Sequence, residues 1–409
     1  MASSSLDIPQ IDITPLLSDD DGSSASDERQ KVAAQLLHAF TTYGVFYITS
    51  PGHPAFASNK ILDASKRLFA LDDDHKAQIP KIQPGGFTRG YVPIGGESGS
   101  QTKELKEGFS YGYEWSEEKL KEHQQQQQQQ QQQAESPNRL LGENSWPTLQ
   151  TLALLDQGIR GGGGSEGEEE EGEKDAFKKV LIEFYLNVCG VAKGLLKGIS
   201  LALKKPEEEL AKYCATSETI SFMRLFHYLP YQDQQHTSQI GSSAHTDWGF
   251  LTLILSPSKT VGLQLFHENA WHDVPSVENT LVVNGGDYLS LLTRGQLISP
   301  LHRVVSNGQE ERYSMCCFYY PDYHAKIPLL VEEKEQVKGQ AASGSYSLLR
   351  DQRSEEEKAT EAASSSGQDG HPQLQGDAQS VADDLLSGKI NFGDYIVGKW
   401  TQVYRKGGY

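Results

Sequence analysis

The chain has 409 residues, a net charge of −18 and only 37% apolar residues, so part of it is expected to lie outside any hydrophobic core. Segments 161–175 and 331–384 carry 13 of the 18 excess negative charges, which leaves −5 for the rest. There is no basic stripe for nucleic-acid phosphates, no run of 18 apolar residues that predicts a membrane span, and no secretory signal at the start. The four cysteines form no CxxC pair. We therefore expect a cytoplasmic, monomeric protein without disulfides, with no nucleic-acid or membrane partner.

The N-terminal region, 1–110, is predicted to combine short strands with helices. Residues 8–13 alternate apolar and polar side chains, which is typical of a strand. Apolar residues at helical spacing predict a helix over 28–43. A second strand is expected over 44–49 and a second helix around 56–70.

Low-complexity inserts are predicted over 111–175. Residues 124–133 are all glutamine, and 161–173 are rich in Gly and Glu. Neither segment can bury enough apolar surface to offset its ordering entropy, so we expect mobile loops there. A long helix is then predicted over 176–203, because its apolar residues form a stripe at helical spacing, with further helical support to residue 217.

The pattern changes over 218–330 to short β-type runs separated by Gly, Pro and Asn, which favours a sandwich or barrel over a parallel α/β sheet. Residues 331–383 are again polar and acidic and predict a disordered insert. Residues 384–409 regain an amphipathic pattern and predict a C-terminal helix. The sequence thus predicts a single, mainly β domain with flanking helices, interrupted by inserts.

A candidate metal site begins with His245 and Asp247, which are two residues apart before a predicted strand and therefore point to the same face. His302 follows a proline at the start of another predicted strand. Two imidazoles and one carboxylate on one side of a metal leave open positions opposite, as in non-haem Fe(II) oxygenases. A structural zinc site would instead close its shell with four protein ligands. With twelve histidines in the chain, His-x-Asp alone is also compatible with ordinary core or surface residues.

Arg312 and Ser314 form a second pair with strand spacing, ten residues after His302. A guanidinium fork beside a hydroxyl is well suited to bind a carboxylate in a bidentate manner. Taken alone, the pair is better explained as a surface arginine and a serine that faces a neighbouring strand. Its position after the second histidine argues against coincidence.

These motifs resemble the HxD…H…RxS pattern of the Fe(II)/2-oxoglutarate-dependent dioxygenases of the isopenicillin N synthase-like type. Four further segments, 8–13, 89–93, 106–109 and 223–228, resemble other parts of that family. The resemblance covers most of the non-repetitive chain. It implies a distorted double-stranded β-helix, or jelly roll, with helices flanking it.

The resemblance also implies the roles of five residues. His245, Asp247 and His302 would hold Fe(II), whereas Arg312 and Ser314 would bind the distal carboxylate of 2-oxoglutarate. With O₂, such enzymes convert 2-oxoglutarate to succinate and CO₂ while they oxidise a small organic metabolite. Hydroxylation, desaturation and ring closure remain open, and so does the substrate.

Further site residues follow from the same resemblance. Tyr228 would add a hydrogen bond to the co-substrate, although the family often has asparagine where this chain has Phe226. Phe318 falls where the family often places an aromatic residue against the organic substrate, and core packing is the alternative for it. Apart from the resemblance, the substrate pocket is expected to be partly aromatic if Phe318 and Trp248 both face it. Asn284 and Asp287 are expected only to shape a turn.

Two alternative functions remain at this point. One is an iron-dependent oxidase or cyclase of the same superfamily that does not use 2-oxoglutarate and holds its substrate's carboxylate with the Arg-x-Ser pair. The other is a non-catalytic protein that binds a small molecule on the same fold. A dioxygenase forms succinate, whereas the oxidase or cyclase does not. Any turnover would exclude the non-catalytic binding protein.

Overall fold

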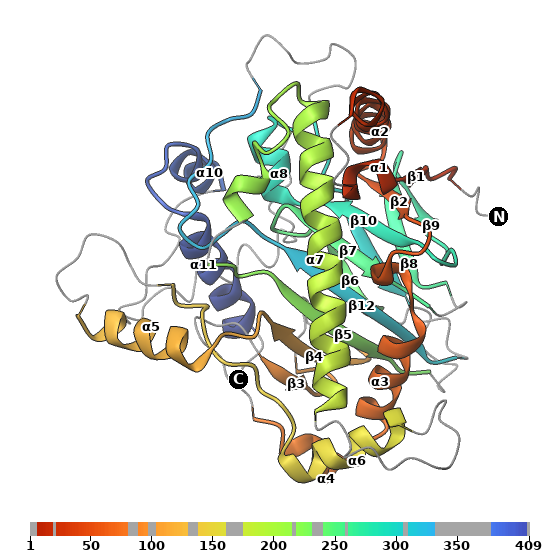
Figure 1. Ribbon diagram of the computed structural model, residues 1–409, viewed down its shortest axis with the longest axis vertical. Helices are drawn as coiled ribbons and strands as arrows, with labels where there is room; N and C mark the ends of the chain where they lie inside the picture. The colour runs from red at the N-terminus through yellow and green to blue at the C-terminus, as the bar shows by residue number, and fades with distance from the viewer. Residues whose placement is uncertain are drawn as a thin grey trace.

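Two β-sheets form the centre of the computed structural model, which describes residues 6–18, 22–80, 89–96, 104–129, 138–160, 175–214, 218–230, 240–257, 261–305, 310–331 and 378–406. The major sheet has eight strands, in the order β1 (Gln10–Asp12), β2 (Val45–Thr49), β10 (Leu281–Gly285), β7 (Leu251–Leu255), β12 (Arg312–Tyr319), β5 (Phe222–Tyr228), β4 (Lys106–Gly112) and β3 (Gly90–Val92). The minor sheet has four, in the order β6 (Ile240–His245), β11 (His302–Val305), β8 (Leu263–His267) and β9 (Ala270–Asp273). Figure 1 shows both sheets.

From β5 to β12 the chain passes back and forth between the two sheets. β5, β7, β10 and β12 belong to the major sheet, whereas β6, the β8–β9 hairpin and β11 belong to the minor sheet. Neighbouring strands in this part are all antiparallel. The mainly β architecture predicted for 218–330 is therefore confirmed, and its alternation leaves an interior space between two facing sheets.

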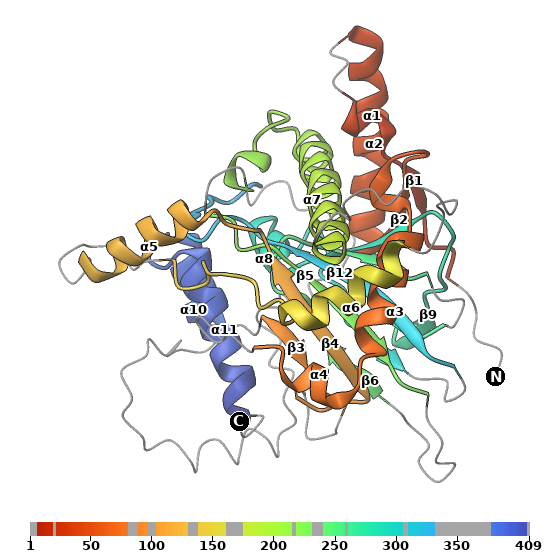
Figure 2. The ribbon, with the colours of Figure 1, turned by 60° about the horizontal axis from the view of Figure 1, so that its bottom comes forward.

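Helices cover the outer face of the major sheet and its ends. The α-helices are α1 (Thr14–Leu17), α2 (Ser23–Thr42), α3 (Asn59–Phe69), α4 (Asp73–Ala77), α5 (Glu117–Gln129), α6 (Leu149–Arg160), α7 (Ala176–Ala202), α8 (Asp287–Leu292), α10 (Ala378–Leu386) and α11 (Phe392–Lys406). Short 3-10 helices are η1 (Pro54–Phe56) and η4 (Ala211–Cys214). α7 runs across the sheet, α2 packs beside it, and α10 and α11 lie at one end (Figures 1 and 2). The helices predicted over 28–43, 56–70 and 176–203 are confirmed.

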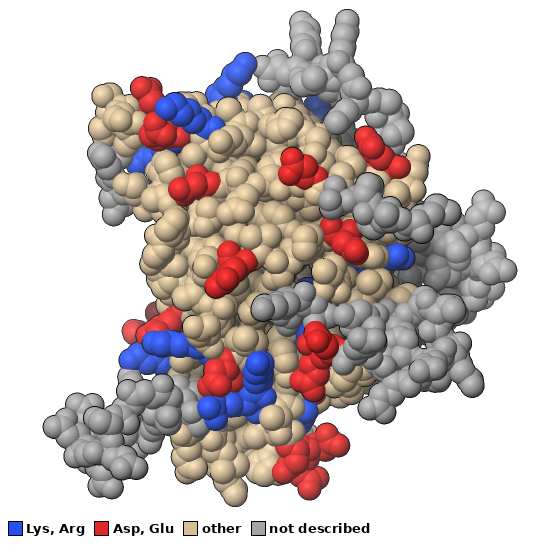
Figure 3. Space-filling model, turned by 90° about the vertical axis from the view of Figure 1, so that its right-hand side faces the viewer, with Lys and Arg blue, Asp and Glu red and all other residues tan. Residues whose placement is uncertain are grey.

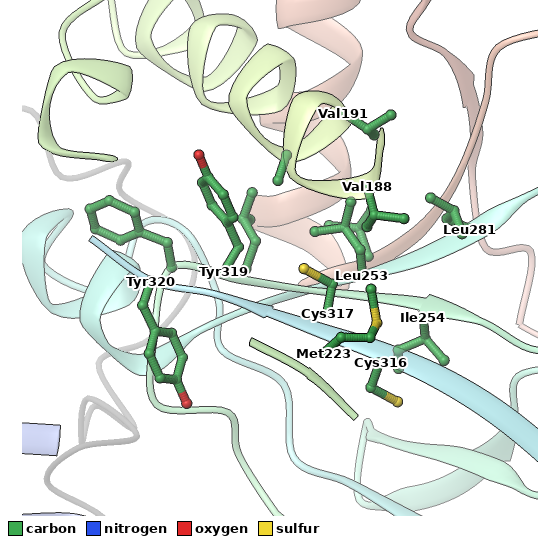
Figure 4. Packing of buried hydrophobic residues seen from close by; sticks show 14 of the residues in the cluster. Val188, Val191, Met223, Leu253, Ile254, Leu281, Cys316, Cys317, Tyr319 and Tyr320 are labelled. Carbon is green, nitrogen blue, oxygen red and sulfur yellow. The ribbon is translucent and has the colours of Figure 1, made fainter. Parts of the chain in front are cut away.

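The main hydrophobic core lies between α7 and the major sheet. In Figure 4, Val188 of α7 points toward the sheet, where Leu253 and Cys317 face it, and Val191 belongs to the same buried cluster. Cys316 points to the opposite side of β12. Because side chains alternate along a strand, the odd-numbered residues of β12 pack under α7 and the even-numbered ones face the space between the sheets. This alternation determines which residues can reach a site inside.

Two helices differ from the low-complexity prediction. α5 extends into the first six residues of the glutamine run, where the sequence predicted a loop. Glutamine is a good helix former, and Glu117 and Glu118 favour the positive end of the helix dipole. α6 lies within the predicted insert region, yet Leu152 and Leu155 are buried, because their spacing gives this helix an apolar face.

The C-terminal region also differs in its boundary. α10 begins at Ala378, inside the segment predicted as a disordered insert, and α11 provides the expected C-terminal helix. The predicted inserts at 130–133, 161–174 and 332–377 lie outside the described residues. Among the residues that are described, no helix combines the length and apolar character needed to cross a membrane. On the face shown in Figure 3, basic and acidic side chains are scattered rather than gathered into a basic surface.

Candidate metal centre and co-substrate site

Three candidate metal ligands converge at the edge where β6 and β11 meet. His245 and His302 are directly opposite in the antiparallel register of these strands, and Asp247 follows β6 by two residues. The Asp247 carboxylate lies 3.8 Å from Nε2 of His245 and 3.7 Å from Nε2 of His302. One ligand atom from each residue falls within 4.8 Å of the others. These distances suit three ligands around one cation.

Hydrogen bonds orient both imidazole rings. Nδ1 of His245 donates to the carbonyl of Ser243 at 2.7 Å, and Nδ1 of His302 donates to the carbonyl of Pro300 at 3.0 Å. Each ring therefore presents the lone pair of Nε2 to the space beside Asp247. Burial and the neighbouring His302 lower the pKa of His245 to about 4, so this ring is neutral and able to bind a metal near pH 7.

Asn284 and Asp287 support the metal motif, and the prediction that they only shape a turn is wrong. Asn284 lies in β10 and donates to Oδ2 of Asp247 at 3.3 Å. Asp287 begins α8, and its backbone N–H donates to the carbonyl of Asp247 at 2.7 Å. The Asp287 carboxylate also accepts hydrogen bonds from Thr246 at 3.0 Å and Ser299 at 2.7 Å. The two glycines that follow Asn284 suggested a turn. The apolar residues before it, 281–283, were the better signal, because they predict a buried strand that carries Asn284 inward.

Arg312 and Ser314 face the interior between the sheets, as their spacing predicted. The register of β12 and β5 places Arg312 opposite Tyr228, and the guanidinium carbon lies 4.9 Å from the centre of the Tyr228 ring. Nη2 of Arg312 donates to Ser256 at 3.2 Å. Nε and Nη1 are buried and have no hydrogen-bond partner within the described part of the chain. Buried guanidinium donors are costly unless they meet an acceptor, so a carboxylate fits here.

The metal ligands and Arg312 share one interior. Gly241 of β6 lies against the Tyr228 ring so closely that a Cβ there would be 2.7 Å from a ring carbon. The Cys316 thiol faces the same interior from β12, and burial raises its pKa to about 12. Because Gly241 lies on the strand that ends at His245 and the Tyr228 ring contacts Arg312, this arginine faces the same interior as the candidate metal ligands.

An aromatic cluster occupies another part of this interior. Phe318 is half-buried on the same face of β12 as Arg312 and stacks on Phe222 with ring centres 4.8 Å apart. The Trp248 ring meets Trp400 of α11 edge-on at 5.1 Å. The guanidinium carbon of Arg224 lies 5.5 Å from the Trp400 ring centre.

Sequence reasoning missed two residues of this cluster. Arg224 is four residues before Tyr228, so counting by twos along the strand would have placed it on the same face. Trp400 carries no such signal, because its position depends on how α11 docks against the sheets.

Comparison with known proteins identifies the family. A model described as the 2OG-Fe(II) oxygenase superfamily matches residues 219–321, which include all three candidate metal ligands. A second model, for the N-terminal region of non-haem dioxygenases in morphine synthesis, matches residues 8–148. The two together match more than half of the chain. The chain belongs to the 2OG-Fe(II) oxygenase superfamily.

This oxygenase is similar to proteins from plants and fungi. It is 28% identical over 347 residues to homoarginine-6-hydroxylase 2-ODD-C23 of Glycine max, covering 83% of this chain and 93% of the relative. It is 26% identical over 313 residues to the 2-oxoglutarate-dependent dioxygenase traH of Penicillium crustosum, covering 75% and 83%. The oxygenase is thus a 2-oxoglutarate-dependent dioxygenase that uses Fe(II), 2-oxoglutarate and O₂.

Solved structures support the fold of the oxygenase. A full-length Neurospora crassa protein, solved in complex with alpha-KG, matches with a TM-score of 0.59 at 22% identity, covering 83% of this chain and 92% of that one. A dioxygenase for auxin oxidation from rice matches with a TM-score of 0.52 at 19% identity, covering 80% and 89%. The predicted double-stranded β-helix with flanking helices is confirmed.

Proposed function

We propose that His245, Asp247 and His302 bind Fe(II), and that Arg312, Ser314 and Tyr228 bind the distal carboxylate of 2-oxoglutarate for the oxidation of a small organic metabolite. The observation that carries this proposal is the convergence of three ligand atoms within 4.8 Å. Bound iron and co-substrate supply the oxidising power, and 2-oxoglutarate leaves as succinate and CO₂.

The chain's own residues prepare the site in three ways. The carbonyl-bound histidines present neutral Nε2 atoms, and Asp247 adds one negative charge for a divalent cation. Arg312 selects a second carboxylate, because its buried donors require an acceptor. The two sheets limit access of water, which strengthens these interactions.

Phe318 and Trp248 are proposed as contacts for the organic substrate. Phe318 lies on the interior face, and Trp248 directly follows the metal carboxylate. Their aromatic surroundings favour a substrate with a planar or apolar surface. We further propose that the enzyme is of the isopenicillin N synthase-like type and acts as a cytoplasmic monomer; its four described cysteines are free thiols, as expected in a reducing compartment.

An anaerobic titration tests this assignment. Addition of Fe(II) and then 2-oxoglutarate should produce a weak visible charge-transfer band in the wild type. The band should be lost in His245→Ala and kept in His38→Ala, which removes an exposed histidine of α2. No band in the wild type, or an unchanged band in His245→Ala, would contradict the assignment.

Product analysis then defines the reaction. After admission of O₂, succinate should form in proportion to oxidised metabolite. A mass gain of one oxygen identifies hydroxylation, and a loss of two hydrogens identifies desaturation or ring closure. Turnover without succinate would instead support the oxidase or cyclase alternative.

A further inference from the structure

Lys106 places a second cationic side chain in the interior that holds Arg312. It begins β4 and pairs with Tyr228 of β5, which pairs on its other side with Arg312 of β12. These three residues form one row across three neighbouring strands, with their side chains on the same face. The Lys106 side chain is only 13% exposed. The row therefore has a largely buried ammonium at one end, a buried guanidinium at the other and a tyrosine between them.

The ammonium group of Lys106 has two acceptors among the described residues. Its Nζ lies 2.7 Å from Oε2 of Glu104 and donates to Oγ of Ser242 at 3.2 Å. Nζ also lies 5.2 Å from the centre of the Phe226 ring. An ammonium carries three N–H bonds, so one donor remains for an acceptor that enters the interior.

Glu104 anchors this ammonium to the strand that carries a metal ligand. Its Oε1 accepts the backbone N–H of Ser243 at 2.8 Å, and the carbonyl of the same Ser243 orients His245. Burial alone would raise the pKa of Glu104, but Lys106 and Ser243 lower it overall, so the carboxylate is ionised. Through their hydrogen bonds to Ser242 and Ser243, Lys106 and Glu104 connect the start of β4 in the major sheet to β6 of the minor sheet.

The charge of Lys106 reaches both halves of the site. Its ammonium donates to Ser242 of β6, three residues before His245, and Lys106 pairs with Tyr228, whose ring centre lies 4.9 Å from the guanidinium carbon of Arg312. Neighbouring strands are about 4.8 Å apart, so the backbones of the first and third residues in the row lie about 10 Å apart. A five-carbon dicarboxylate fits between two side chains that reach inward from those ends.

We propose that Lys106 binds the carboxylate at the metal end of 2-oxoglutarate, while Arg312 binds the distal one. Lys106 is thus a positioning residue for the co-substrate. The inference rests on the proposed function, because it takes Arg312 as the distal clamp. The alternative is that Lys106 and Glu104 only connect the two sheets, through Ser242 and Ser243. The two roles of Lys106 predict different changes in affinity for 2-oxo acids with and without a distal carboxylate.

Equilibrium binding to two 2-oxo acids separates them. The wild type and Lys106→Met, loaded with Fe(II) under anaerobic conditions, are titrated with 2-oxoglutarate and with 2-oxopentanoate, which lacks the distal carboxylate. Lys106→Met should weaken both ligands by the same factor, about tenfold or more, because a charge-assisted hydrogen bond is lost. Arg312→Met should weaken 2-oxoglutarate alone. Lys106→Arg keeps the charge and should restore most of the affinity.

Glu104→Gln should change the affinity for 2-oxoglutarate in the opposite direction from Lys106→Met, or leave it unchanged. It removes the negative partner of Lys106, so by the proposal it retains or tightens 2-oxoglutarate binding. If the ion pair is purely structural, Lys106→Met and Glu104→Gln should each weaken the binding of both the metal and 2-oxoglutarate. Metal titration and thermal unfolding of each variant identify that outcome, which would overturn the proposal.

Two other results would also overturn it. In the first, Lys106→Met binds both 2-oxo acids as tightly as the wild type does. In the second, Lys106→Met loses affinity for 2-oxoglutarate but not for 2-oxopentanoate. If the wild type itself binds neither acid, the proposed function fails, and this inference fails with it.

Discussion

Asp287→Ala tests how strongly the metal motif depends on the residues behind it. Asp287 is 2% exposed and accepts hydrogen bonds from Thr246 at 3.0 Å and Ser299 at 2.7 Å. Thr246 lies inside the His-x-Asp motif, and Ser299 precedes the second metal histidine by three residues. One carboxylate thus connects both segments that carry candidate ligands.

The expected loss follows from these two hydrogen bonds. Each buried hydroxyl that loses a charged acceptor costs about 1–3 kcal/mol, so the free energy of unfolding should fall by about 2–6 kcal/mol. In a domain of this size, the melting temperature should drop by about 5–10 °C. Loss of such support behind metal ligands lowers metal affinity by about 10–100-fold.

Thermal unfolding of the metal-free protein and titration with Fe(II) or Mn(II) measure both effects. Asp287→Asn keeps one acceptor and should give intermediate values. Asp63→Ala is the matched control, because Asp63 of α3 makes an exposed pair with Arg67 at 2.7 Å; its change should stay within about 0.5 kcal/mol. If Asp287→Ala matches this control in stability and metal affinity, the reasoning is refuted.

Three further predictions concern the rest of the site. Gly241→Ala places a Cβ 2.7 Å from the Tyr228 ring, so 2-oxoglutarate binding should weaken severalfold in the anaerobic titration; unchanged binding would show that the ring shifts without consequence. Trp400→Ala removes the edge-on contact with Trp248 at 5.1 Å. The fold-increase in KM for the organic substrate should exceed the fold-decrease in the rate of 2-oxoglutarate turnover without substrate. Equal fold-changes in these two quantities would argue against a substrate contact. Fe(II) or Mn(II) at 100 times its Kd should stabilise the chelator-treated protein by about 2.7 kcal/mol; the gain should vanish in His302→Ala, and a gain that persists there would argue against His302 as a ligand.

The interior-facing residues of β12 were predictable because they depend on strand periodicity. A period of two places Arg312 and Ser314 on one face whatever the sheet order. The same rule applied to β5 connects Tyr228 with Arg224, which extends the interior face along a second strand. Local patterns of this kind need only correct strand boundaries.

The contacts behind the site could not be predicted in this way. Asn284 of β10 reaches Asp247, and Glu104, two residues before β4, reaches Ser243 of β6, so each contact joins segments that are far apart in sequence. Such contacts depend on which strands become neighbours and in what register. Side-chain patterning within one segment carries no information about either. The sequence therefore predicted the candidate ligands but not the residues that hold them in place.

Phe226 shows how one substitution can be interpreted only with its surroundings. By sequence, the absence of the family's asparagine counts against a co-substrate role for this part of β5. In the structure, Phe226 is opposite Ser314 on one side and Gly108 on the other, with the Lys106 ammonium 5.2 Å from its ring centre. An aromatic face attracts a cation and keeps water away from it, which strengthens the field of that charge. By the role proposed for Lys106, charge from the neighbouring strand takes the place of the family's amide donor on β5.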